Sequence, residues 1–197
     1  KESDTGRVQF AGLTCSLPSE SVCGAHWTAQ QDGSGVEIVL CDGLGHGPLA
    51  AHEAQDLAAA YEALDGEPGD ILSRLSHQLS DRRGAVAAAI KVEPETAALA
   101  YGGVGNISTI LVRKGEVKRF PVRDGRIGGQ PLTAFSEAKT LQSGDVIVLH
   151  SDGLSTFRPH EFNMALFSRP PLSIAATLLH TNLRGRDDAS IAVLRFD

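Results

Sequence analysis

The chain has 197 residues, a length suited to one compact domain with a sizeable core. Hydrophobic residues make up 42% and charged residues 21%, a balance that excludes a disordered tail and is typical of a globular protein. The formal charge is −6, and Lys and Arg form no cluster beyond pairs such as Arg82 and Arg83, so nucleic acid is not expected as a partner. We therefore predict a single domain over residues 1–197.

No apolar run reaches the roughly 20 residues that a membrane helix needs, and residues 1–7 are polar, without the apolar segment of a signal peptide. This predicts a soluble, cytoplasmic protein without a membrane partner. Cys15, Cys23 and Cys41 lack CxxC spacing, so we expect buried, reduced thiols and neither a disulfide framework nor a zinc site.

Apolar runs rich in β-formers predict at least eight strands. In chain order they cover 8–14, 36–41, 85–92, 97–102, 108–112, 116–120, 146–150 and 190–196. Helical patterns occupy 48–64, 69–79 and 171–183, and the alanines of the first predict close packing against a sheet. Residues 113–116 predict a hairpin turn, and residues 121–140, rich in Gly, Pro and Arg, predict a surface loop near the site. This order favours an antiparallel α+β domain, a β-sandwich flanked by helices, over alternating βαβ units.

Asp42, Asp152 and Asp187 share one setting, because each lies where an apolar strand meets a turn. One Asp-Gly pair after a strand is ordinarily only a turn, but two such pairs and an Asp-Asp pair favour a common site. Carboxylates gathered without cations repel one another, whereas hard divalent cations prefer oxygen ligands. Neither His nor Cys gathers with them, so the pattern predicts Mg²⁺ or Mn²⁺ over Zn²⁺, and phosphoester hydrolysis by a metal-held hydroxide.

Four motifs carry a family resemblance: DGLGHG at 42–47, VGN at 104–106, HSDGL at 150–154 and RDDAS at 186–190. Over nearly the whole chain, their order and spacing resemble the SpoIIE-type branch of the metal-dependent type 2C (PPM) serine/threonine protein phosphatases. Residues 21–24 and 83–85 are most similar to the small RsbX-like members. The resemblance implies a four-layer αββα sandwich of two mainly antiparallel sheets flanked by helices.

The resemblance also implies a substrate and a site. The substrate would be phosphoserine or phosphothreonine on a STAS-type anti-sigma antagonist or stressosome protein, attacked by metal-bound water. Two Mn²⁺ or Mg²⁺ ions are implied. Carried over by position, Asp42 would bridge the ions, the Gly43 carbonyl would bind one, Asp152 and Asp187 would hold the other, and Asp188 would have a supporting role.

One departure concerns residue 25. Where these relatives read Gly-Asp after the second strand, this chain reads Gly24-Ala25, so an acidic group beside the metal pair is missing. Two interpretations stay open: a phosphatase with a site impaired at Ala25, or a catalytically weak or inactive pseudophosphatase that serves as a regulatory binding domain. His26 is a conceivable substitute ligand, although the alternation of side chains along a strand favours a structural role. A metallohydrolase of small phosphoesters is a third hypothesis, because fold alone does not fix the substrate.

Three further residues have two interpretations each. His46 is a candidate proton donor to the leaving group, or only a loop residue. Asn106 belongs to a turn or lines the site, and Trp27 is expected in the core or at the sandwich rim. The chain starts at Lys1 without an initiator Met, so we expect a fragment of a longer protein with an upstream ATPase- or kinase-like domain, as in relatives.

Overall fold

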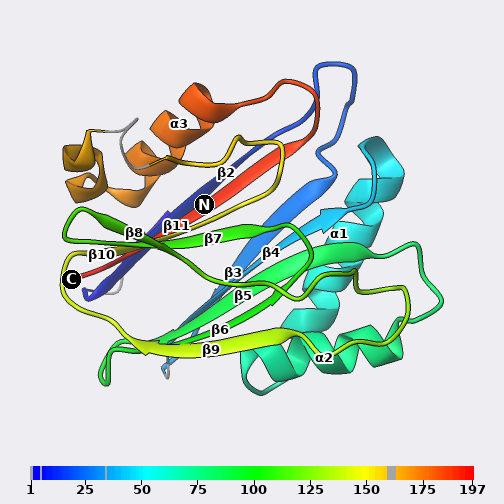
Figure 1. Cartoon of the computed structure of the whole chain (residues 1–197), viewed down its shortest axis with the longest axis horizontal. Helices are drawn as coiled ribbons and strands as arrows, with labels where there is room; N and C mark the ends of the chain where they lie inside the picture. Colours follow the sequence, from blue (N-terminus) through cyan, green and yellow to red (C-terminus); the bar gives the residue numbers. More distant parts are fainter. Residues whose placement is uncertain (1, 5, 34, 159–162) are drawn as a thin grey trace.

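Two antiparallel sheets face each other in the computed structural model, which describes residues 2–4, 6–33, 35–158 and 163–197 (Figure 1). In the described residues, the first sheet has the order β1-β2-β11-β10-β7-β8 and the second β3-β4-β5-β6-β9. The strands of the first sheet are β1 (Glu2–Asp4), β2 (Val8–Cys15), β11 (Ala189–Phe196), β10 (Asp145–His150), β7 (Ser108–Arg113) and β8 (Glu116–Arg119). Those of the second are β3 (Ala25–Gln31), β4 (Val36–Gly43), β5 (Ala85–Glu93), β6 (Ala98–Val104) and β9 (Phe135–Thr140).

Helices cover the outer faces of both sheets. Helices α1 (Gly47–Glu62) and α2 (Pro68–Gln78) pack on the second sheet, and α3 (Pro171–Asn182) packs on β2 and β11 of the first (Figure 1). A short 3₁₀ helix, η2 (Met164–Ser168), precedes α3. The predicted α+β sandwich with four αββα layers is therefore confirmed.

Three apolar clusters follow these layers. The central one fills the space between the sheets, with side chains such as Phe10, Ile38 and Leu149. A second lies under α1 and α2, and a third under α3. Because strands β4, β5, β10 and β11 are covered on both faces, they read as almost continuous apolar runs, which is why the sequence predicts them well.

Helix α1 lies very close to β4, as its alanine content predicts. Ala50, Ala54 and Ala58 are buried against the sheet. A Cβ added to Gly43 would lie only 2.1 Å from the carbonyl oxygen of Ala50, so only glycine permits this approach. The first turn of α1 is thereby fixed beside the end of β4, where Asp42 lies.

The predicted hairpin at residues 113–116 joins β7 and β8, with Lys114 and Gly115 both at positive φ. The prediction that 121–140 is entirely a loop is wrong, because Phe135–Thr140 forms β9 at one edge of the second sheet. Strand β3, at the other edge of that sheet, was also not predicted. Both strands carry few apolar residues, since an edge strand has one hydrogen-bonded neighbour and can expose polar side chains.

The positions of Trp27 and of the three cysteines agree in part with the predictions. Trp27 is partly buried against the central core, and its ring lies against Gly12 of the facing sheet. All three cysteines are free, but only Cys41 is buried, whereas Cys15 and Cys23 are half-buried near the start of β11. In the described residues, no helix is long and apolar enough to span a membrane.

Candidate metal centre

Asp42, Asp152 and Asp187 reach one cavity from different strands. Asp42 lies near the end of β4 in the second sheet, and Asp152 and Asp187 flank the neighbouring strands β10 and β11 of the first. The cavity has a volume of about 360 Å³ and opens to solvent. Its lining comprises Asp42, Gly43, Leu44, Gly45, Val86, Gly105, Asn106, Asp124, Gly125, Asp152 and Asp187. The sheet ends thus place the three predicted aspartates together.

The electrostatics of the cavity disfavour so many carboxylates without a cation. Burial, followed by repulsion from Asp152 and Asp187, raises the pKa of Asp42 to about 8. Burial is also the main cause that raises the pKa of Asp187, with Asp152 acting in the same direction. In the part of the chain that the structure describes, no Lys or Arg forms an ion pair with these three aspartates.

Asn106 lines the cavity, as one of its two interpretations required. Its side-chain amide donates to Oδ2 of Asp152 at 2.7 Å, and Gly105 before it has a φ of 91°. The amide therefore orients the Asp152 carboxylate from the loop between β6 and β7.

Asp124 also lines the cavity and was not recognised from the sequence. It lies in the loop before β9, and the backbone of Ile127 in that loop pairs with Ala85 at the start of β5. The available signal was a further Asp-Gly pair, Asp124-Gly125. No strongly apolar strand ends at this pair, and an Asp-Gly pair without one is ordinarily a turn.

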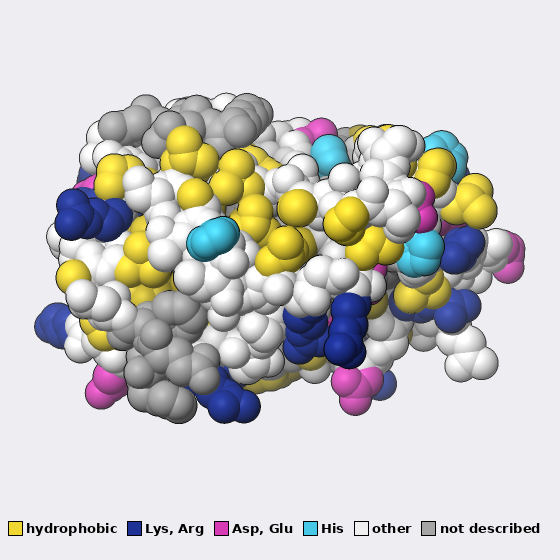
Figure 2. Space-filling view, turned by 90° about the horizontal axis from the view of Figure 1, so that it is seen from above, with side chains coloured by type: hydrophobic (Ala, Val, Ile, Leu, Met, Phe, Trp, Pro, Cys, Tyr) yellow, Lys and Arg dark blue, Asp and Glu magenta, His cyan; other side chains and the backbone are white. Residues whose placement is uncertain are grey.

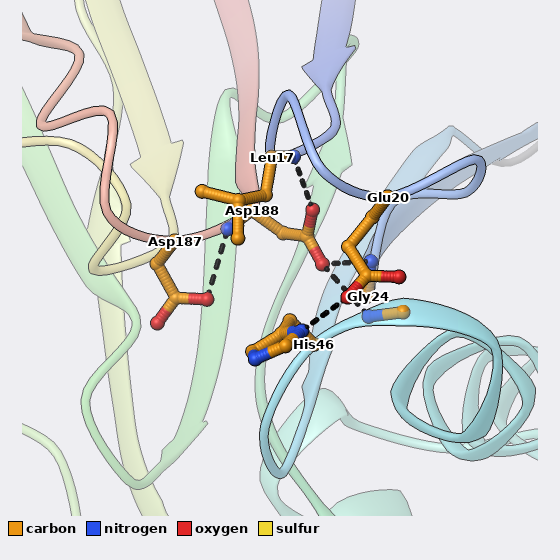
Figure 3. Close-up of polar contacts among 7 residues, drawn as sticks. Leu17, Glu20, Gly24, His46, Asp187 and Asp188 are labelled. Carbon is orange, nitrogen blue, oxygen red and sulfur yellow. Dashed lines mark hydrogen bonds and ion pairs between the residues drawn. The ribbon is translucent and has the colours of Figure 1, made fainter.

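Asp188 does not face the cavity but joins three backbone segments (Figure 3). It is 1% exposed, and its carboxylate accepts hydrogen bonds from the backbone N–H groups of Leu17 at 2.7 Å and Gly24 at 2.6 Å. Gly47, the first residue of α1, donates a longer one at 3.4 Å. The neighbouring Asp187 accepts from the backbone N–H of Asp188 at 2.9 Å, so this junction also helps to position Asp187.

Replacing Asp188 with Ala is expected to lower the free energy of unfolding by about 3 kcal/mol or more, because several buried N–H groups lose their acceptor. The Asp188→Asn variant keeps the shape and one acceptor oxygen, so its loss should be smaller. Urea unfolding of the metal-free proteins measures both values. A loss of under about 0.5 kcal/mol in the alanine variant, the range of ordinary surface changes, would contradict this role.

His46 directly precedes α1 and lies next to the cavity without lining it. Its Nδ1 lies 2.6 Å from Oε1 of Glu20 in the loop before β3, and its side chain is about half exposed (Figure 3). His26 is not a substitute ligand: it does not line the cavity, and its nearby charge is Glu62 of α1, on the outer face of the second sheet. The alternation of strand side chains explains this position.

Ala25 lies directly opposite Asp42 in the β3–β4 register and is buried. In an antiparallel pair, opposite residues have Cβ atoms about 5 Å apart on the same face. A carboxylate at position 25 would therefore neighbour that of Asp42, and the alanine leaves this side without an oxygen ligand.

The donor groups suit a hard divalent cation. They are oxygens only, and a cation would relieve the repulsion that raises the pKa of Asp42. Among the described residues, no three Asp, Glu, His or Cys side chains are arranged closely enough to hold one ion between them. Mg²⁺ commonly keeps several waters and takes only one or two carboxylates, so such a dispersed set still fits it.

Comparison with known proteins agrees with this geometry. Residues 32–197 match the family described as stage II sporulation protein E (SpoIIE). The phosphoserine phosphatase RsbX of Bacillus subtilis is 29% identical over 140 residues, 69% of each chain. A crystal structure of RsbX with magnesium superposes with a TM-score of 0.86 at 22% identity, covering 100% of this chain and 99% of that one.

The PP2C phosphatase domain of SpoIIE from Bacillus subtilis has the same fold, with a TM-score of 0.78 at 16% identity over 97% of this chain and 62% of that one. The sandwich and the family match together define a phosphoprotein phosphatase of the PP2C type. Within that class, the chain belongs to the SpoIIE family.

Proposed function

We propose that this chain is a Mn²⁺- or Mg²⁺-dependent serine/threonine protein phosphatase that acts on a phosphorylated STAS-type anti-sigma antagonist or stressosome protein. The observation that carries the proposal is the convergence of Asp42, Asp152 and Asp187, from both sheets, on one cavity without a cationic partner among the described residues. The similarity to RsbX, a phosphoserine phosphatase, supports a phosphorylated side chain as substrate. An open cavity suits a residue presented on a protein surface better than an enclosed small molecule.

In this proposal, Asp42, Asp152, Asp187 and the Gly43 carbonyl hold the ions. Bound divalent cations would supply an activated water and neutralise the phosphoryl oxygens during in-line displacement. Asn106 orients Asp152 by its hydrogen bond, and the close contact of Gly43 with α1 fixes the end of β4. Without cations, the ionised aspartates of the cavity repel a phosphate dianion, so metal-free protein should bind substrate weakly.

In this proposal, the missing carboxylate at position 25 weakens one of the two metal positions. The activity should therefore need higher Mn²⁺ concentrations than that of a relative with the Asp. The same feature favours the second candidate, a pseudophosphatase that binds a regulatory protein without turnover. An upstream ATPase- or kinase-like domain in the intact protein and a cytoplasmic location stay predictions.

Phosphate release from a serine-phosphorylated STAS-domain protein and from p-nitrophenyl phosphate tests the proposal. We expect release with Mn²⁺ or Mg²⁺ and its abolition by EDTA. No release from either compound at millimolar Mn²⁺, by the wild type and by Ala25→Asp alike, would contradict a phosphatase. Retained binding of the phosphoprotein in that case would identify the pseudophosphatase.

A further inference from the structure

Four large apolar side chains are exposed in the described part of the chain: Val22, Leu49, Leu172 and Leu183. Leu49 is the most exposed, at 66%. Isolated apolar residues on a surface are ordinary, and only their gathering on one face indicates a binding surface.

Three of these residues come from segments that meet at Asp188. Val22 belongs to the loop 16–24, whose two ends donate hydrogen bonds to the Asp188 carboxylate. Leu49 lies in the first turn of α1, whose initial N–H approaches the same carboxylate. Leu183 directly follows the last residue of α3 and begins the segment that leads to Asp188. Figure 3 shows how closely these segments approach one another beside Asp187.

Helix α3 extends the apolar surface away from this junction. It contains no Asp, Glu, Lys or Arg. Leu172, Ala176, Leu179 and Leu183 follow a four-three-four spacing, which places them on one side of the helix. The opposite side, with Ile174 and Leu178, is buried on the sheet. Figure 2, seen from the side of α3, shows apolar side chains extending across much of this face.

Positive charge adjoins the apolar surface, although the chain is acidic overall. Arg184 and Arg186 follow Leu183 and are exposed, and neither forms an ion pair with a described residue. The next residue, Asp187, lines the cavity. Along the chain, a helix without Asp, Glu, Lys or Arg is therefore followed by two arginines without an ion pair among the described residues, and then by the candidate metal centre. This arrangement is complementary to an acidic, phosphorylated protein.

We propose that Val22, Leu49, Leu172 and Leu183 form a docking face for the phosphoprotein substrate. This inference rests on the proposed function. The partner presents an apolar patch with acidic side chains beside its phosphoserine. The patch covers Leu49 and Leu183, the acidic groups meet Arg184 and Arg186, and the phosphoserine enters the cavity. Substrate selection then depends on this face, whereas the chemistry depends on the aspartates.

The test uses the double variant Leu49→Gln/Leu183→Gln and the single variant Arg184→Gln. For the double variant, kcat/KM for a serine-phosphorylated STAS-domain protein should fall about tenfold or more, the effect of losing about 1.4 kcal/mol of binding. For p-nitrophenyl phosphate, which cannot reach the docking face, it should change less than about twofold. In EDTA, where turnover stops, the phosphoprotein should bind more weakly to every variant, and the double variant should still raise its Kd by a similar factor relative to the wild type. Arg184→Gln should weaken the phosphoprotein interaction more at low salt than at high salt.

Lys118→Gln is the matched control, because it also removes one positive charge from an exposed residue, on β8. It should leave kcat/KM unchanged for both substrates. Equal thermal midpoints would establish that the variants fold. Equal losses on both substrates, or unchanged turnover and binding of the phosphoprotein, would overturn the docking face alone. A wild-type dimer that becomes monomeric in the double variant would instead identify a contact between copies of this chain and also overturn it. Wild-type protein that releases phosphate from neither compound would overturn the proposed function and this inference together.

Discussion

Replacing Asp42 with Asn is expected to lower Mn²⁺-dependent phosphate release by about 10³-fold, the scale on which removal of a key electrostatic group acts. Asp42 is the one of the three predicted aspartates that the second sheet contributes, and its strand neighbour Ala25 offers no oxygen that could replace it. Initial rates at saturating Mn²⁺ measure the effect. Asp65→Asn is the matched control, since Asp65 also precedes a glycine but is exposed, away from the cavity. A loss of under about tenfold would contradict a central role for Asp42.

The same variant should be more stable than the wild type in EDTA. The pKa of Asp42 in the folded protein is about 8, well above the value of about 3.9 in an unfolded chain. Below about pH 4 the Asp42 carboxyl is protonated in both states and costs the folded protein no stability. As the pH rises from about 4 to about 8, the unfolded chain ionises this carboxyl first, so the free energy of unfolding falls. The difference in unfolding free energy between Asp42→Asn and the wild type should grow over this range and then level off. Urea unfolding from pH 4 to 9 measures it, and a difference that does not change with pH would contradict the burial of a charged Asp42.

The accuracy of the sequence prediction depended on where each strand lies in its sheet. Strands β4, β5, β10 and β11 have neighbours on both sides and helices or the facing sheet on both faces, so their apolar runs are long. The strands that were not predicted, β1, β3 and β9, all lie at sheet edges. An edge strand has one hydrogen-bonded neighbour and can expose polar side chains, so it needs no long apolar run. Without such a run, composition within a short window does not reveal the strand.

The sequence predicts those residues of the candidate site that lie in short local motifs. Asp42, Asp152 and Asp187 were found because each adjoins a strongly apolar strand, and their meeting follows from strand order. Asp124, which lines the cavity, and the contact of Glu20 with His46 beside it depend on loops that are far apart in the sequence. For Asp188, a supporting role was expected, but its three hydrogen bonds to backbone N–H groups could not be predicted from the sequence, because these partners lie 141 to 171 residues away.

Position 25 is where sequence and structure together give the most direct route to changing the activity. The register places Ala25 opposite Asp42, in a buried position at the start of β3. A carboxylate there would add an oxygen ligand to the metal position that we propose is weakened. In the metal-free state the same group would add repulsion to a set of carboxylates that already raises the pKa of Asp42. The substitution should therefore have opposite effects with and without metal.

We expect Ala25→Asp to tighten Mn²⁺ binding about 100-fold. Loss of a group that only supports a metal ligand weakens metal affinity by about 10- to 100-fold, and a direct ligand should contribute at least as much. Phosphate release at limiting Mn²⁺ should rise in parallel, because the second metal position fills. In EDTA the variant should unfold at a lower temperature than the wild type. Calorimetric titration with Mn²⁺, rates at varied Mn²⁺ and thermal unfolding measure these effects. Ala25→Asn adds a side chain of the same size without the charge, so it separates charge from packing. If Ala25→Asp binds Mn²⁺ no more tightly than Ala25→Asn, a carboxylate at position 25 does not act as a ligand, and the proposed weakening of the site at Ala25 is contradicted.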